Sequence, residues 1–123
     1  MDRTPLLKYT DYQLTLIKEE SQPLVVGEVT AFKMRTLMMQ QLMQVKWSKV
    51  QRITTDVEDD LELLELLKDL LDGVGNILLE VYHDGETSCA YSRAVQSSER
   101  VVNSKFYREL KGFVDQLDRE MKK

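Results

Sequence analysis

The chain is poor in the residues that mark secreted, membrane-spanning or catalytic proteins. It has one cysteine, Cys89, and one histidine, His83, among 123 residues. A single cysteine excludes a disulfide framework within the chain, so we expect a reducing, cytoplasmic compartment. Residues 1–5 begin no apolar secretory signal, and no run approaches the roughly 18 uncharged apolar residues of a membrane span. The sequence therefore predicts neither export nor insertion into a membrane.

The same scarcity limits the chemistry that the chain can offer. His83 and Cys89 suggest a thiolate activated by an imidazole. In a hairpin turning at Asp84-Gly85, however, they would not face each other, and we interpret them as a turn histidine and a buried thiol. The acids of 56–72 lack the alternating order of a calcium loop, and the glycines form no phosphate-binding motif. We predict no catalytic residue, no metal site and no cofactor.

Composition places the chain in the globular class. Hydrophobic residues make up 42% and charged residues 31%, and the length suits one domain over residues 1–123. A domain of this size can bury a core without disulfides or metals. The net charge of −4 argues against a protein that grips nucleic-acid backbone.

The charges are unevenly distributed along the chain. Residues 29–55 contain five bases and no acid, whereas residues 56–72 contain eight acids and only Lys68 as a base. We interpret the two stretches as neighbouring helices with complementary flanks. The alternative is a basic face for an acidic partner.

One apolar seam dominates what the chain does contain. Alternate steps of four and three residues from Val25 to Val81 meet an apolar residue at every stop except Thr36, Lys46 and Asp60. This 3.5-residue period indicates helices whose apolar stripe packs against another helix. The seam predicts an all-α fold, a small bundle of three to four helices with coiled-coil-like packing. It also favours pairing of two chains.

The N-terminal region carries weaker signals. We expect an irregular arm over residues 1–10. Residues 12–17 fit either a strand or a short helix that Thr10 and Gln13 would cap. Pro23 marks a break before the next element.

Two helices are expected in the middle of the chain. Apolar spacing predicts the first over 26–45, and it favours a helix over a strand in 45–55 as well. Thr55 followed by Glu58 has the pattern of a capping box, which predicts the start of the acidic, leucine-rich helix.

The region around Gly73 and Gly75 leaves two alternatives. The helix either runs through both glycines or ends there, with a β-hairpin over about 77–95 that turns at Asp84-Gly85. The second alternative makes the fold α+β with the same main helices.

A last helix is expected to begin at Ser97 or Ser98, with Gly112 marking a close helix crossing. Its predicted apolar stripe is Phe106, Leu110, Phe113, Val114, Leu117 and Met121.

These patterns favour binding over catalysis. Met34, Met38, Met39 and Met43 lie on successive helical turns before Trp47, and the flexible thioether suits adaptable binding surfaces. We predict that these five residues bind a partner. The protein would then be a non-catalytic interaction module such as a small adaptor, regulator or assembly chaperone. Its partner would be another protein, first of all a second copy in a homodimer.

A nucleic-acid-associated regulator is the alternative function. Lys46, Lys49 and Arg52 surround Trp47, and such a basic segment with an aromatic residue can hold phosphates and stack a base. The competing interpretation is a basic edge around a core tryptophan.

Overall fold

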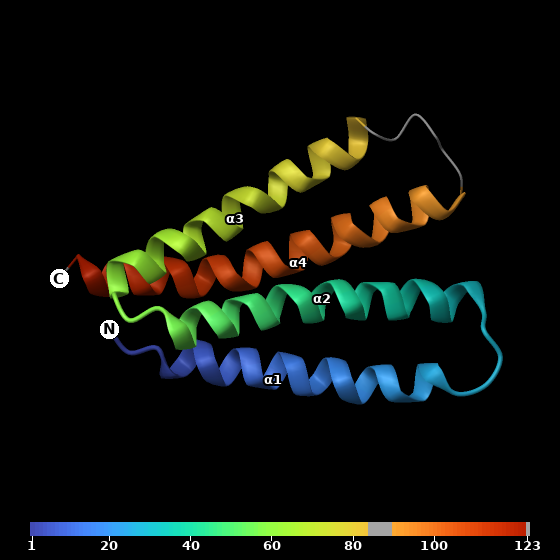
Figure 1. Ribbon diagram of the computed structural model, residues 1–123, viewed down its shortest axis with the longest axis horizontal. Coiled ribbons are helices and arrows are strands. Elements are labelled where there is room, and N and C mark those ends of the chain that lie inside the picture. The colour runs from blue at the N-terminus through green and yellow to red at the C-terminus, as the bar shows by residue number, and fades with distance from the viewer. Residues whose placement is uncertain (84–89, 123) are drawn as a thin grey trace.

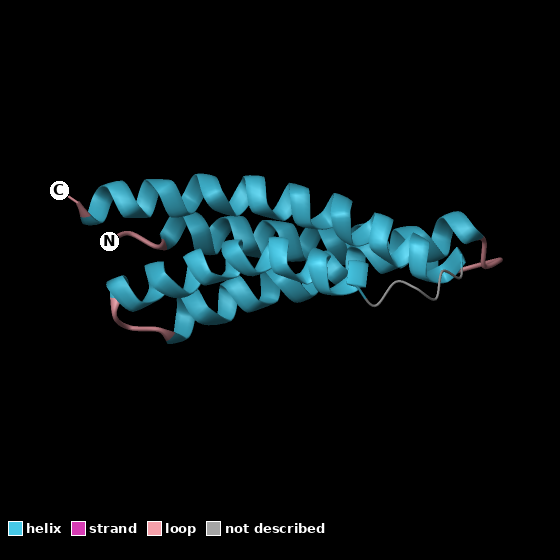
Figure 2. Cartoon of the chain, turned by 90° about the horizontal axis from the view of Figure 1, so that it is seen from above, coloured by secondary structure: helices cyan, strands magenta, loops and turns pink. Residues whose placement is uncertain are grey.

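The computed structural model describes residues 1–83 and 90–122, with side chains for 1–73 and 96–122 (Figure 1). Over these residues the chain forms helices and no strand (Figure 2). The elements are α1 (Thr4–Ser21), the short 3-10 helix η1 (Gln22–Val25), α2 (Ala31–Asp56), α3 (Asp60–His83) and α4 (Ala90–Met121). The predicted all-α bundle is confirmed.

The four helices run up and down in turn. α2 and α4 pack against each other at the centre, α1 packs on α2, and α3 packs on α4. α2 and α3 touch only slightly. Both termini and the α2–α3 connection lie at one end of the bundle, and the α1–α2 connection lies at the other (Figure 1).

Aromatic rings form the middle of the core. Trp47 of α2 has no exposed surface, and its ring centroid lies 5.3 Å from that of Tyr9 in α1 and 5.0 Å from that of Phe106 in α4. Tyr9 also meets Phe113 of α4 at 5.0 Å. Each pair contributes about 0.5–1.5 kcal/mol beyond its buried area. Three of the four helices are thus joined around one tryptophan.

The N-terminal region is the largest departure from the sequence prediction. Residues 1–10 were expected to be irregular, but α1 begins at Thr4 with Pro5 in its first turn, where the fixed φ of proline suits a helix. The buried positions of α1 are Leu6, Thr10, Gln13 and Ile17. Two of these four are polar, which is why the apolar pattern does not reveal the helix.

Thr10 does not cap a helix. It lies within α1, and its hydroxyl donates to the Leu7 carbonyl at 2.8 Å. Residues 12–17 also lie within α1, so the strand alternative for this segment is wrong.

α2 begins later and ends later than expected. Thr30 caps it, since its hydroxyl accepts a hydrogen bond from the Lys33 backbone at 3.1 Å, and Ala31 is the first helical residue. The helix continues through 45–55, which confirms the helical interpretation there. Thr55 therefore lies inside α2 and donates to the Gln51 carbonyl at 2.8 Å. The capping box predicted at Thr55 is wrong.

α3 starts at Asp60, directly after Asp59. The Asp59 carbonyl accepts the first helical hydrogen bond, from the Leu63 amide at 2.9 Å. The helix then runs through Gly73 and on to His83, so the helical alternative is confirmed up to that residue. The predicted Asp84-Gly85 turn lies outside the described residues.

α4 starts at Ala90, so Ser97 and Ser98 lie within it and cap nothing. Gly112 is exposed, with no atom within 4 Å of a Cβ placed there, so the predicted close crossing at this glycine is wrong. The predicted stripe lies against the core apart from Met121, which is 38% exposed.

The seam folds back on itself across the α2–α3 turn. Val50 of α2 and Leu64, Leu67 and Leu71 of α3 are all buried within one chain. The first stops, among them Phe32, stay exposed. The described middle of the seam therefore holds one bundle together.

The end that carries the termini is closed by polar contacts. The Arg3 guanidinium donates to the carbonyls of Thr54 at 2.9 Å, Val57, and Glu58 at 2.9 Å, and pairs with Asp60 at 2.8 Å. These carbonyls lie at the C-terminal end of α2 and in the turn that follows, where helical partners are missing. A cation also suits the negative end of the helix dipole. We call this arrangement the closed end.

Candidate protein-interaction surfaces

Exposed apolar side chains gather at the end opposite to the closed end. We define the apolar tip as Val25, Val26, Val29, Phe32 and Met34, at the α1–α2 connection and the first turns of α2 (Figure 1). The first four are 72–75% exposed and Met34 is 49% exposed. Scattered exposed apolar residues are ordinary, whereas a group of neighbouring ones is a candidate for an interaction surface.

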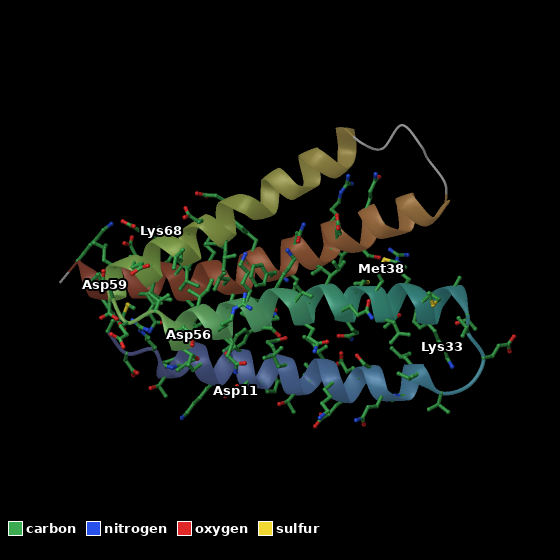
Figure 3. All side chains as sticks on the ribbon, viewed as in Figure 1. Asp11, Lys33, Met38, Asp56, Asp59 and Lys68 are labelled. Atoms are coloured by element: carbon green, nitrogen blue, oxygen red, sulfur yellow. The ribbon has the colours of Figure 1, made fainter. Side chains whose placement is uncertain are left out.

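The backbone beneath the apolar tip is well fixed. Gly27 has a φ of 93°, a conformation that other residues rarely adopt. The Lys33 ammonium, labelled in Figure 3, donates to the Val26 carbonyl at 2.8 Å, and Thr30 caps α2. The connection that exposes these apolar side chains is therefore supported by hydrogen bonds within the chain.

The predicted methionine face passes from this tip into the core. Met34 is exposed, Met38 and Met39 are half-buried, and Met43 and Trp47 are buried. The gradient arises because the later turns of α2 are covered by α1 and α4. Of the five residues predicted to bind a partner, Met34 offers the most surface, and their role in binding stays a prediction.

The residues of the nucleic-acid alternative are separated by burial. Trp47 is enclosed by aromatic rings and exposes no surface for stacking on a base. Lys49 and Arg52 are exposed. Lys46 is half-buried with its ammonium 5.4 Å from the Phe106 ring centroid, and burial lowers the pKa of this amine. The arrangement resembles a basic edge over a core tryptophan, and nucleic-acid binding stays a prediction.

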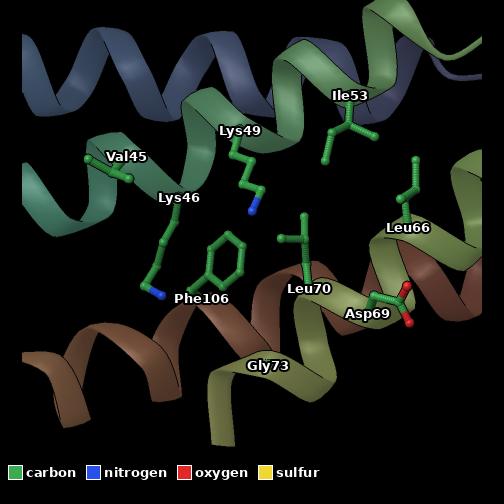
Figure 4. A pocket seen from close by; sticks show the side chains of 9 residues that line it. All are labelled: Val45, Lys46, Lys49, Ile53, Leu66, Asp69, Leu70, Gly73 and Phe106. Carbon is green, nitrogen blue, oxygen red and sulfur yellow. The ribbon is translucent and has the colours of Figure 1, made fainter. Parts of the chain in front are cut away.

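A groove opens between α2 and α3 (Figure 4). Phe106 of α4 forms its floor, and the side chains of α2 and α3 form its two walls. Its volume is about 380 Å³, within the range of ligand sites. The lining residues are Val45, Lys46, Lys49 and Ile53 of α2, Leu66, Asp69, Leu70 and Gly73 of α3, and Phe106. We call it the α2–α3 groove.

The α2–α3 groove exists because two helices that follow each other in the chain hardly touch. Gly73 contributes no side chain, and nothing lies within 4 Å of a Cβ placed there. From the charge pattern, the bases of α2 and the acids of α3 were expected to form complementary flanks. Among the described residues, however, no ion pair joins Lys46 or Lys49 to Asp69, and the groove keeps the two flanks apart.

The described structure offers little support for other classes of site. The side chains of His83 and Cys89 lie outside the described set. Within the described part of the chain, no three His, Cys, Asp or Glu residues are grouped so that they could hold a metal ion. No described helix combines the length and apolar character needed to cross a membrane.

Comparison with protein-family models, curated protein sequences and solved structures finds no match to this chain.

Sequence reasoning missed the α2–α3 groove and the closed end. The clustering of bases in 29–55 and of acids in 56–72 pointed to the flanks of the groove. No local signal indicated that α2 and α3 stand apart, because that spacing depends on how each packs against α4.

Proposed function

We propose that this protein is a non-catalytic protein–protein interaction module that pairs with a second copy through the apolar tip. The observation that carries the proposal is the group of exposed side chains from Val25 to Met34 on an ordered connection. An apolar surface on a fixed backbone loses little freedom when it binds. Its burial would contribute about 25 cal/mol per Å² before the cost of association.

A pair of this kind would use the same patch on both chains. In a twofold dimer Phe32 of one chain would lie near the corresponding tip of its partner, because such interfaces are self-complementary. A role as an adaptor, regulator or assembly chaperone belongs to the same proposal. A reducing compartment such as the cytoplasm is supported by the single cysteine of the sequence.

The test is light-scattering mass over a concentration series. We expect the wild-type mass to rise from 14.4 kDa toward twice that value. Val29→Ser with Phe32→Ser should keep the chain monomeric, since it removes two apolar side chains of the tip that are 73% and 75% exposed.

Tyr12→Ser with Leu61→Ser is the matched control. These residues are 61% and 53% exposed but lie on α1 and α3, away from the apolar tip. The control should associate like the wild type. A wild type that remains monomeric throughout, or a tip variant that associates as strongly, contradicts the proposal.

A further inference from the structure

We propose that the α2–α3 groove binds an amphipathic helix of a partner protein. About two turns of that helix would lie in the groove, with acidic residues on the flank facing α2 and basic residues on the flank facing α3. The inference rests on the proposed role as a protein-binding module, but it assigns a second surface that is separate from the apolar tip.

The length of the groove suits a short helical segment. On α2 it extends from Val45 to Ile53, and on α3 from Leu66 to Gly73. With a rise of 1.5 Å per residue, eight residues along α2 span about 12 Å. A bound helix uses about this length to place apolar residues at positions i, i+3 or i+4, and i+7, which is the usual pattern of a helix in a groove.

The walls and floor are apolar where such anchors would lie. Val45 is 68% exposed, and Ile53 and Leu70 are partly buried beside the Phe106 floor. A partner's leucine or methionine side chains would cover this surface and remove it from water. The apolar interior therefore selects for an apolar stripe.

The rims select for charge. Lys46 and Lys49 stand on the α2 side, and neither forms an ion pair with a described residue, although the charge of Glu99 in α4 acts favourably on the partly desolvated Lys46. A partner carboxylate would give these two ammonium groups a direct ion-pair partner. Asp69 stands on the α3 side and forms no ion pair with any residue whose side chain the structure describes. An occupant with acids on one flank and bases on the other satisfies both rims, whereas an anionic amphiphile would satisfy only one.

Gly73 provides a sharp way to close the groove. A leucine at this position meets no atom within 4 Å of its Cβ and would project into the open space that the groove offers. Gly112 is the matched control, because it is also helical and also has nothing within 4 Å, but it does not line the groove. Leucine favours a helix more than glycine does, so both Gly73→Leu and Gly112→Leu should fold.

The probe is a fluorescein-labelled 18-residue helical peptide. It carries a leucine stripe at i, i+3, i+4 and i+7, glutamates along one flank and lysines along the other. A second peptide of identical composition mixes glutamate and lysine on both flanks. This mixed peptide has no segregated flanks in either direction along the groove. The difference in affinity between the two peptides therefore measures the contribution of the charged rims.

Fluorescence anisotropy at chain concentrations below self-association gives the affinities. We expect the segregated peptide to bind at least tenfold more tightly than the mixed one. Gly73→Leu should weaken its binding at least tenfold and Gly112→Leu should leave it unchanged. Lys46→Glu with Lys49→Glu should abolish the preference for segregated flanks. Helical circular dichroism of each variant verifies that the fold is intact.

Three results would overturn the inference. The two peptides bind equally, the two glycine variants bind equally, or decanoate binds in place of the peptide and is excluded by Gly73→Leu. The last result would make the groove a site for anionic amphiphiles.

The outcome is independent of the apolar tip. Val29→Ser with Phe32→Ser should bind the peptide like the wild type. If the chain forms dimers but does not bind the peptide, only the proposed role of the groove is contradicted. If it binds the peptide but stays monomeric, only the proposed pairing is contradicted.

Discussion

The helix connections at the two ends of this bundle differ in how their residues are covered. At the closed end, one partly buried arginine, Arg3, satisfies the carbonyls around the α2–α3 turn, and its side chain is only 17% exposed. At the apolar tip, Val26 and Phe32 are each 75% exposed although Gly27 and Lys33 fix the backbone. Hydrogen bonds support both connections, so the exposed side chains at the tip do not result from a lack of backbone contacts. The comparison shows that contacts within the chain hold the closed end, whereas the apolar tip leaves its side chains free for the proposed pairing.

Of the changes at the two ends of the bundle, Arg3→Ala should lower the free energy of unfolding the most. It leaves the carbonyls of Thr54 and Val57 without their partner and removes the pair with Asp60. Loss of hydrogen bonds to a charged group predicts a decrease of about 2 kcal/mol in the free energy of unfolding. Urea denaturation measures it.

Lys8→Ala is the control for that prediction. Lys8 is exposed on the same helix, so its replacement should change stability by less than about 0.5 kcal/mol. Equal losses in the two variants would show that the contacts of Arg3 do not hold the closed end.

Acid should weaken the closed end through Asp60. The Arg3 hydrogen bond, assisted by the N-terminal ammonium, lowers the pKa of this carboxyl from its ordinary 3.8. A lowered pKa in the folded state contributes stability above the ordinary value, and this contribution is lost as the pH falls through the folded pKa. The wild type should therefore lose stability from about pH 4 downward, and Asp60→Asn should flatten this part of the profile.

Asp118→Asn is the comparison for the acid profile. Hydrogen bonds from Lys122 and Lys68 lower the pKa of Asp118, as the Arg3 hydrogen bond lowers that of Asp60. Asp118→Asn should keep the part of the acid-induced loss of stability that is due to Asp60. A profile unchanged by Asp60→Asn would show that the pair with Arg3 is not maintained in solution.

The smallest effect on stability is expected at the apolar tip. Val29→Ser with Phe32→Ser should change the free energy of unfolding by less than about 0.5 kcal/mol, because both side chains already face water. Phe106→Ser, which empties the floor of the groove and the side of Trp47, should cost about 3–5 kcal/mol. The free energies of unfolding of the two variants are measured by thermal and urea denaturation of the monomeric species. If the tip variant lost more than about 2 kcal/mol in the free energy of unfolding, the tip would be part of the core, and the contrast between the two ends would be wrong.

The errors at the helix ends share one physical cause. Thr10 and Thr55 were expected to accept hydrogen bonds from amides at helix starts, but each lies in a helix and donates back to a carbonyl, of Leu7 and Gln51 respectively. A threonine hydroxyl can do either, and the same short pattern fits both. Which one occurs depends on whether the neighbouring turns are held by packing.

The candidate surfaces were predictable only in part. Helical spacing correctly placed Met43, Trp47 and Phe32 on apolar stripes, but such spacing does not say which stripe another helix covers. In the structure, α1 and α4 cover Met43 and Trp47, and nothing within the described chain covers Phe32. The tip and the core therefore look alike in the sequence.

By itself, the sequence determined that this chain forms helices with apolar stripes and that its bases and acids fall on successive helices. Those features depend on residues three or four positions apart, so they can be read locally. Only the tertiary structure decided which apolar residues are enclosed, where the α2–α3 groove opens, and how Arg3 reaches Asp60 across 57 residues of chain. Burial and ion pairing depend on neighbours that folding brings together, and no local pattern encodes their distance.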